Sequence, residues 1–392
     1  DNANRTGRDN SLYGRLGVTS SLLDGRWQTS LVLGRLQTDR RFTVFPGLGD
    51  TGAGESKYNG TRTNLQFNNT VTLPDVGPVS KAALTFGAEH IADEARVRAN
   101  SDFSGFLFSQ SALAHSDQSA GYAGLQGRLF ERLTLTGNVR GETNTLTKEA
   151  VTYRVGGAFA VPEVLTTFKA SYGTAFRAPS LFDRYGVDSF GYIGNPALKP
   201  ESSRGYELGF VTDVPLVTPE GLSVAATYFD NRIRNLIQGV FFPVSTVVNV
   251  AQATARGVET SVTLRPVEWA EAVLTYTYTD TRNPATGARL LRRPLNAASA
   301  VLRLKPLPGL IVAPELLYTG AFQDFLVDDG GFGRAVGRSK SGVIGHLNVT
   351  YDVLPSLTLY AYARNIGGSR FEPASGFATP GPSVLFGTKA RF

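Results

Sequence analysis

Two residue types are missing from this chain of 392 residues: it contains no cysteine and no methionine. Without cysteine, neither a disulfide framework nor a thiolate metal site can form. Because translation starts on methionine, we expect Asp1 to follow a removed segment, so that no signal peptide remains to be read.

Long apolar runs are missing as well. No stretch of the sequence approaches the roughly 18 consecutive apolar residues that a membrane-spanning helix needs. At 42% hydrophobic residues and 10% aromatic residues, the chain is too apolar for disorder and too polar for a helical membrane bundle. The net charge of +6 comes from scattered arginines, so no nucleic-acid partner is expected. If the chain spans a membrane, it must do so as a β-barrel.

Histidine is scarce, and its placement suggests no active site. His90, His115 and His346 are the three histidines, and none has the spacing of a nucleophile's partner or a metal ligand. No Ser and His pair can be nominated for a hydrolase. We therefore expect no enzyme, no catalytic residue and no metal site.

Period-two alternation recurs throughout the sequence, interrupted by Gly, Pro, Asn and Asp clusters, and this pattern predicts strands and turns. In 133–140, 206–210 and 258–265, apolar residues alternate with polar or charged ones. The strands of a soluble sandwich are typically about 5 to 6 residues long, whereas spanning strands need about 9 to 11. The runs here are of the longer kind. About seventeen strands are predicted to start near Ser11, Arg26, Thr61, Lys81, Ser119, Leu133, Ala150, Val164, Ser202, Leu222, Ala255, Glu271, Arg293, Leu310, Lys340, Ser356 and Pro382.

The connections between these strands alternate between short and long. Short ones are predicted at 23–25, 74–78, 130–132, 162–163, 266–269, 306–309 and 353–355. Long ones are predicted at 41–60, 94–118, 177–201, 238–254, 323–339 and 367–381, and the short link 147–149 is the one exception. Such alternation is typical of an up-and-down barrel with short turns at one rim and long loops at the other. The predicted fold class is therefore all-β, a transmembrane antiparallel up-and-down β-barrel.

The segment 171–210 carries the most specific motif. Residues 171–180 read SYGTAFRAPS, residues 194–201 read GNPALKPE, and residues 206–210 read YELGF. In order and spacing these pieces resemble the signature of TonB-dependent outer-membrane receptors, in which a strand, an exposed loop and a turn lead into the next strand. The signature residues are Phe176, Arg177, Pro179, Asn195, Pro196, Pro200 and Glu201.

The C-terminal end resembles the same family. Phe386 and Phe392 lie on the apolar face of the last predicted strand, which looks like the closing strand that barrel-assembly machinery recognises. The segment 364–367, reading RNIG, resembles part of the family's penultimate strand. Matches of this kind extend from about Tyr172 to Phe392.

The resemblance also implies what the chain lacks. Large transporter barrels of this type have about 22 strands and a plugged lumen. About seventeen predicted strands and no candidate plug suggest that residues 1–392 are one partial barrel domain, without the N-terminal plug and the first strands. An odd number of strands cannot close with every neighbouring pair antiparallel, which supports the same expectation.

The function implied by the resemblance is uptake of a metal chelate across the bacterial outer membrane into the periplasm. The expected partners are the TonB–ExbB–ExbD complex, contacted through the missing plug, together with outer-membrane lipids and the barrel-assembly machinery. The cargo would be a ferric siderophore or cobalamin. Haem receptors carry a histidine between the two signature boxes, and no histidine lies between Pro179 and Asn195. A passive porin-like channel or adhesin barrel is the alternative, and a soluble all-β binding protein is a third possibility.

Candidate ligand contacts lie in the loop that the signature frames. Aromatic rings supply contact area at low entropic cost, and here they are mixed with charges. An aromatic girdle at the membrane interface would use the same residue types. The candidates are Phe182, Arg184, Tyr185, Asp188, Phe190 and Tyr192, with Phe325 from the loop 323–339. Asp324, Asp328 and Asp329 could hold calcium through oxygen ligands, but a solvated acidic loop is the favoured explanation because their spacing matches no EF-hand pattern, and no cofactor is expected.

Overall fold

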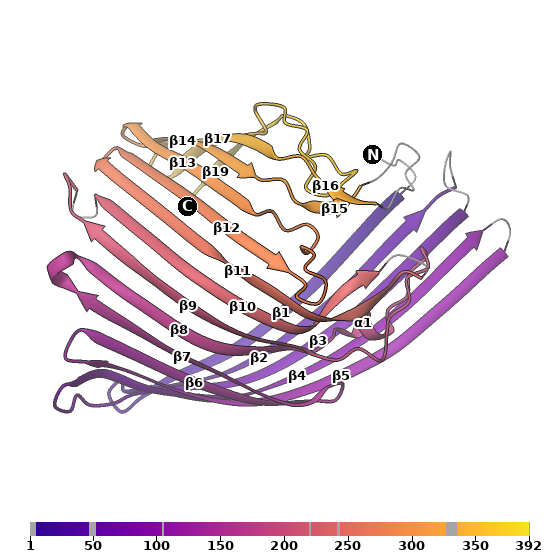
Figure 1. The fold of residues 1–392 in the computed structure, drawn as a ribbon, viewed down its shortest axis with the longest axis horizontal. Coiled ribbons are helices and arrows are strands. Elements are labelled where there is room, and N and C mark those ends of the chain that lie inside the picture. Colours follow the sequence, from indigo (N-terminus) through magenta and orange to yellow (C-terminus); the bar gives the residue numbers. More distant parts are fainter. Residues whose placement is uncertain are drawn as a thin grey trace. The chain divides into compact units, whose positions relative to one another are not determined.

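The computed structural model describes residues 5–46, 52–103, 106–218, 221–240, 244–326 and 335–391. These residues are mostly strand (Figure 1). The elements are β1 Arg5–Leu22, β2 Trp27–Val44, β3 Gly52–Thr72, β4 Val79–Phe103, β5 Phe106–Leu129, β6 Leu133–Asn144, β7 Lys148–Val161, the 3₁₀ turn η1 Pro162–Val164, β8 Thr166–Arg177, α1 Leu181–Tyr185, β9 Glu201–Val214, β10 Leu222–Val240, β11 Thr246–Val267, β12 Ala270–Arg282, β13 Asn296–Leu307, β14 Leu310–Thr319, β15 Gln323–Phe325, β16 Val336–Arg338, β17 Gly342–Leu354, β18 Leu357–Arg364 and β19 Ser383–Ala390. Within the described ranges, no helix has the length and apolar character to cross a membrane.

The chain divides into two compact units. Unit 1 comprises residues 1–157, 172–204 and 233–252, and unit 2 comprises the remainder. In unit 1, β1 to β6 form a meander in which each strand pairs antiparallel with the next (Figure 1). In unit 2, β11 to β14 and then β17 to β19 pair in the same consecutive way, and β15 pairs with β16 as a separate hairpin. These pairings confirm the antiparallel up-and-down prediction.

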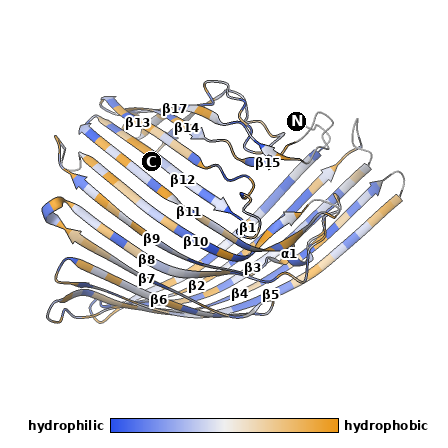
Figure 2. Ribbon diagram, viewed as in Figure 1, coloured by the Kyte–Doolittle hydropathy of each residue, from blue (hydrophilic) through white to orange (hydrophobic). Residues whose placement is uncertain are grey.

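All seventeen predicted strands have a counterpart, namely β1 to β14 and β17 to β19. The prediction succeeded because in each strand neighbouring side chains point to opposite sides, so one apolar and one polar face leave a period of two in the sequence. Figure 2 shows the resulting alternation of hydrophobic and hydrophilic residues along the strands.

Unit 1 therefore has two distinct faces. On what we term the apolar face, Leu16 lies opposite Leu33, and Leu33 lies opposite Leu65, and all three side chains are exposed. On the polar face, Gln66 donates to Glu89 at 2.7 Å, and Arg140 pairs with Glu89 at 2.7 Å. An exposed apolar row of this kind, backed by ion pairs, is the reverse of a soluble sandwich, whose apolar residues face its core.

The predicted long connections 41–60, 94–118 and 238–254 are wrong over much of their length. β2 and β3 stay paired as far as Val44 and Gly54, and β4 and β5 stay paired as far as Phe103 and Phe106. The residues 95–99, which read ARVRA, continue the alternation, and this signal was available in the sequence. β1 to β5 are 18 to 25 residues long, which exceeds the roughly 9 to 11 residues that a spanning strand needs.

Two other connections differ in detail from a simple loop. The predicted loop 323–339 contains the hairpin β15–β16, and the loop 177–201 contains α1. The short link after β6 is confirmed: a tight turn forms there because the Asn144 side chain accepts from the backbone N–H of Leu146 at 2.8 Å. An Asn side chain that accepts a backbone bond two residues further on stabilises such a turn.

Candidate ligand-binding site

The loop between β8 and β9 begins with the single helical turn α1. Ser180 caps it, because its hydroxyl accepts from the backbone N–H of Asp183 at 3.0 Å, and the Asp183 carboxylate accepts from the backbone N–H of Ser180 at 2.9 Å. This reciprocal capping box satisfies backbone donors that a short helix leaves without partners. Gly186 ends the turn with a backbone bond to the carbonyl oxygen of Phe182 at 2.8 Å.

Glu201 closes the loop at its other end. Its carboxylate is largely buried; one oxygen accepts from the backbone N–H of Ile237 at 2.7 Å, and the other accepts from Arg177 at 3.0 Å. Arg177 also lies 3.6 Å from the Asp183 carboxylate. Two signature residues at opposite ends of the loop, Arg177 and Glu201, are therefore joined directly, which fixes the base of the loop.

The GNP turn ties the loop to the strands that follow it. Asn195 donates its side-chain amide to the carbonyl oxygen of Val247 at 3.0 Å, and its backbone N–H bonds to the carbonyl oxygen of Asp183 at 2.8 Å. The carbonyl oxygen of Pro200 accepts from the Asn235 side chain at 3.3 Å. These bonds hold the loop to β10 and β11.

The side chain of Arg184 is held by the backbone carbonyl oxygens of two other residues. Its guanidinium donates to the carbonyl oxygen of Leu146 at 2.6 Å and makes two bonds to the carbonyl oxygen of Pro196. The backbone of Arg184 also comes so close to Gly194 that a Cβ on that glycine would lie 2.6 Å from the Arg184 carbonyl carbon. Arg184, predicted as a ligand contact, thus has a structural role that the sequence did not reveal.

A second turn in the loop attaches it to β3. Asp188 accepts backbone bonds from Phe190 and Tyr192, both at 2.8 Å. Next to Asp188, Ser189 donates its backbone N–H to the hydroxyl of Ser56 at 2.9 Å, and the Ser56 hydroxyl donates to that of Ser189 at 3.0 Å. Ser56 is 1% exposed, so this contact is a buried anchor between segments far apart in the sequence.

Four aromatic rings connect the loop with the strands beneath it. Phe182 stacks on Tyr192, with the ring centres 4.8 Å apart and an angle of 2° between the ring planes. Phe182 also packs edge-on against Tyr58, with the ring centres 5.7 Å apart. Tyr58 in turn packs edge-on against Phe42, with the ring centres 6.1 Å apart. Burial, followed by the nearby carboxylates of Asp183 and Asp188, raises the pKa of Tyr192 to about 12. The Tyr192 ring is therefore neutral at physiological pH and part of the packing of the loop.

A cavity of about 520 Å³ lies between α1 and the polar face of β2 to β5. Its walls include Phe42, Tyr58 and Tyr185, and its floor includes the small side chains of Ala95 and Ala112. The strand positions Phe42, Tyr58, Ala95 and Ala112 share a face with Glu89, yet at the loop ends of the strands this face is apolar or aromatic. Pockets of 300 to 1,000 Å³ lined mainly by apolar and aromatic groups suit small ligands.

Sequence reasoning missed the strand half of this cavity, because it assigned 41–60 and 94–118 to loops. Of the predicted ligand contacts, Phe182 and Tyr185 line the cavity. Phe190 is exposed, with the Arg5 guanidinium 5.1 Å from its ring centre. Whether these residues contact ligand stays a prediction.

The remaining predicted residues lie in unit 2 or outside the described ranges. Phe325 belongs to β15, and Phe386 is 75% exposed on β19. Asp328, Asp329 and Phe392 lie outside the described residues.

Asp324, considered above as a calcium ligand, has protein partners in the structure. Its side chain is fully buried and accepts from Arg292 at 2.9 Å and from the backbone N–H groups of Phe325 and Ser375, both at 2.8 Å. Burial alone would raise the pKa of this carboxyl, but the hydrogen bonds from Ser375, Arg292 and Phe325 outweigh it and lower the pKa. Asp324 thus joins three loop segments of unit 2.

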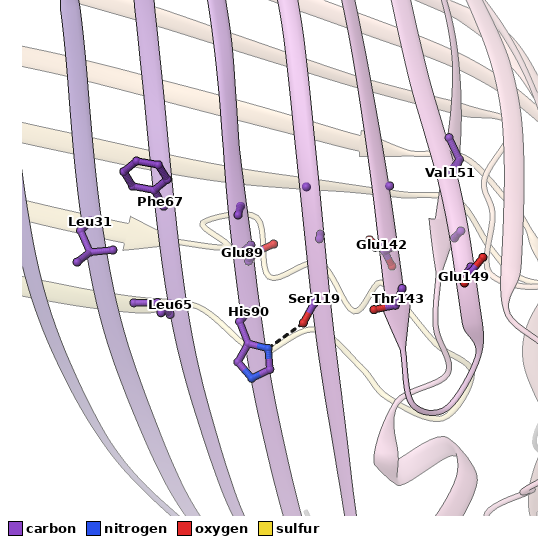
Figure 3. A pocket seen from close by; sticks show the side chains of 15 residues that line it. Leu31, Leu65, Phe67, Glu89, His90, Ser119, Glu142, Thr143, Glu149 and Val151 are labelled. Carbon is purple, nitrogen blue, oxygen red and sulfur yellow. Dashed lines mark hydrogen bonds between the residues drawn. The ribbon is translucent and has the colours of Figure 1, made fainter.

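His90 lies on the apolar face of unit 1, beside a hollow of about 620 Å³ that Figure 3 shows. The hollow exists because Gly121 and Gly141 leave space beside the bulkier Phe67. At its rim, the Nδ1 atom of His90 lies 3.0 Å from the hydroxyl of Ser119 on the next strand. His90 and Ser119 thus satisfy each other's polar groups on this apolar face, as apolar surroundings favour.

Each of the three histidines lies on a strand. His115, predicted in a loop, lies on β5, and His346 lies on β17, where its Nδ1 accepts from the backbone N–H of Asn365 at 3.1 Å. In the part of the chain that the structure describes, no three His, Asp or Glu side chains gather as a metal would require.

Comparison with known proteins identifies the family. Residues 1–366 match the model of the TonB-dependent receptor-like β-barrel. The chain is 26% identical over 337 residues to the iron-regulated outer membrane virulence protein of Vibrio cholerae, covering 80% of this chain and 49% of that protein. It is 28% identical over 176 residues to the vitamin B12 transporter of Vibrio vulnificus, covering 45% of this chain and 25% of that protein.

The fold is similar to that of the pyoverdine outer membrane receptor of Pseudomonas aeruginosa, with a TM-score of 0.76 at 13% identity, covering 99% of this chain and 62% of the receptor. By comparison, the chain spans about half the length of the Vibrio cholerae protein described above. That residues 1–392 are a partial barrel without its plug stays a prediction. The family and the fold are those of receptors and transporters. The chain belongs to the TonB-dependent receptor family of the bacterial outer membrane, and it matches the β-barrel of that family.

Proposed function

We propose that this barrel belongs to a receptor that takes up a metal chelate, a ferric siderophore or cobalamin, across the outer membrane. The observation that carries the proposal is the signature loop of this family, folded over an aromatic-lined cavity. The names of the relatives support both cargo classes, since one is a pyoverdine receptor and another transports vitamin B12.

The chemistry of the cavity favours contact with an apolar or aromatic part of the cargo. Tyr58, Phe182 and Tyr185 present rings to it. Among the described residues of its wall, the arginine is Arg40, which pairs with Asp9 at 2.7 Å, so its charge is compensated. Rings held by a capped helical turn and by stacking lose little entropy on binding, which makes them suitable anchors.

Arg184 and Asp188 were predicted as ligand contacts, but their side chains make hydrogen bonds to the backbone. Both side chains are used to fold the loop. We therefore assign them to positioning the aromatic residues, and leave direct contact to Phe182 and Tyr185.

Uptake measurements test the function. The receptor is expressed from its complete gene in a strain that lacks its own siderophore and cobalamin receptors, with and without TonB. We expect TonB-dependent uptake of labelled cobalamin or of at least one ferric siderophore. No uptake of any of them, or uptake that does not depend on TonB, would overturn the proposal and favour a passive channel or an adhesin.

A substitution tests the site separately. Tyr185→Ala should weaken binding of the transported chelate about fivefold or more, because the ring is an anchor in the cavity wall. Tyr351→Ala removes an exposed ring from β17 that does not line the cavity, and it should leave affinity unchanged. Equal affinity of the Tyr185→Ala variant and the wild type, with uptake intact, would place the ligand elsewhere while leaving the transport function standing.

A further inference from the structure

Three arginines of unit 2 gather around one buried carboxylate. Asp280, near the end of β12, lies 3.0 Å from Arg282 on the same strand, 3.6 Å from Arg256 on β11 and 3.9 Å from Arg289 in the following loop. The Asp280 side chain is 6% exposed, whereas those of Arg256, Arg282 and Arg289 are 61%, 45% and 37% exposed. One negative charge therefore faces three positive charges, and the guanidiniums reach solvent.

The backbone holds this arginine cluster in place. Arg256 and Asp280 are directly opposite in the β11–β12 register, so their side chains share a face. A turn after β12 brings Arg289 back to form an isolated bridge with Arg282. Asn283 tightens that turn, because its side chain accepts from the backbone N–H of Ala285 at 3.0 Å. The three guanidiniums are thus preorganised, which lowers the entropic cost of binding an anion.

The position of the cluster on the strand identifies its surroundings. Tyr276 and Tyr278 precede Asp280 on the same face of β12, and both rings are exposed. The stretch 270–278 is about as long as the roughly 9 to 11 residues that cross a bilayer, and it ends in these tyrosines as the aromatic girdles of outer-membrane barrels do. The cluster therefore lies just beyond the apolar band, at the end of β12 that carries the longer connection.

We propose that Arg256, Arg282 and Arg289 bind the phosphate group of a phosphorylated glycolipid in the outer leaflet. Guanidinium groups suit phosphate because they donate in pairs to its oxygens. The net charge of the cluster complements a phosphate, and its continuity with the exposed tyrosine face places the acyl chains of the same lipid against β12. The proposal rests on the outer-membrane location of the chain and is independent of the cargo.

Lipid binding to the complete receptor, purified in detergent, tests this site. Native mass spectrometry would measure the affinity for lipid A, for dephosphorylated lipid A and for inorganic phosphate. Arg256→Gln should weaken binding of lipid A about fivefold, and the double variant Arg256→Gln/Arg289→Gln roughly twenty-five-fold. Arg256→Lys keeps the charge but not the paired donors, so it should also weaken binding.

Arg303→Gln is the matched control. It removes the same charge from β13, where Arg303 pairs with Glu271 on the opposite face, and it should leave lipid affinity unchanged. Migration of unheated samples in gels shows that each variant is folded. Unchanged lipid A affinity in a folded double variant would overturn the proposal. Equal binding of dephosphorylated lipid would also overturn it, and so would phosphate binding as tight as that of lipid A, which would indicate a site for free anions.

Discussion

Glu201 should control how often the signature loop opens. Glu201→Ala removes the acceptor of the Ile237 backbone N–H, and a buried donor that loses its partner costs about 1 to 3 kcal/mol. The ion pair with Arg177 adds less than about 1 kcal/mol, because the Arg177 side chain is 56% exposed and solvent screens it. The loop should therefore be destabilised by about 1 to 4 kcal/mol, which corresponds to roughly 5 to 900 times more frequent opening.

Limited proteolysis measures this opening. Trypsin cleaves after arginine, and Arg184 is shielded while its guanidinium is bonded to backbone carbonyls. When opening is fast relative to cleavage, the cleavage rate follows the population of the open loop. The rate after Arg184 in intact outer membranes should therefore rise by the same factor in Glu201→Ala, while barrel assembly stays intact.

Two further variants separate the hydrogen bond from Ile237 and the ion pair with Arg177 from a general effect of charge. Glu201→Gln keeps an oxygen that accepts from Ile237 and loses the charge facing Arg177, so it should change the cleavage rate by no more than about fivefold. Asp24→Asn removes the same charge in the turn between β1 and β2 and should have no effect. Wild-type cleavage of Glu201→Ala would refute the idea that Glu201 closes the loop.

Two pH-dependent effects are expected as well. Because folding raises the pKa of Tyr192 from 10.0 to about 12, its contribution to loop stability is complete below pH 10 and is lost as the pH rises towards 12; Tyr192→Phe, which keeps the stack on Phe182, should abolish this alkaline loss of protease protection. Folding lowers the pKa of Asp324 below 3.8, so its contribution is complete above that value and is lost as the pH falls through the lowered one. Asp324→Asn should raise hydrogen exchange at Ser375 already at neutral pH and remove the acid transition, and an acid transition that persists in this variant would contradict the assignment.

Much of the fold was accessible from the sequence because its main signal is local. In a strand with one apolar and one polar face, the period of two is written in consecutive residues. This located seventeen of the nineteen strands that the structure describes, all but the short β15 and β16. Strand ends were less accessible from the sequence. Beyond the apolar band the outward-facing residues become polar, as do the arginines in ARVRA at 95–99. Such segments were therefore assigned to loops, although the backbone pairing of the strands continues through them.

The candidate site shows the same division. The signature located the loop. Phe182 and Tyr185, which it predicted as ligand contacts, line one cavity, and their contact with ligand stays a prediction. The sequence could not show that Arg184 is bonded to backbone carbonyls, because its partner Leu146 lies 38 residues away.

By itself, the sequence determined the class of protein, the order of the strands and the place of the functional loop, since alternation and motif are properties of neighbouring residues. Only the tertiary structure decided which charged and aromatic groups are engaged in holding the loops. Ser56 and Ser189 are 133 positions apart, and Asp324 and Ser375 are 51 apart. Such pairs form because, within each unit, the pairing of strands brings segments that are distant in the sequence side by side, and no local pattern records that outcome.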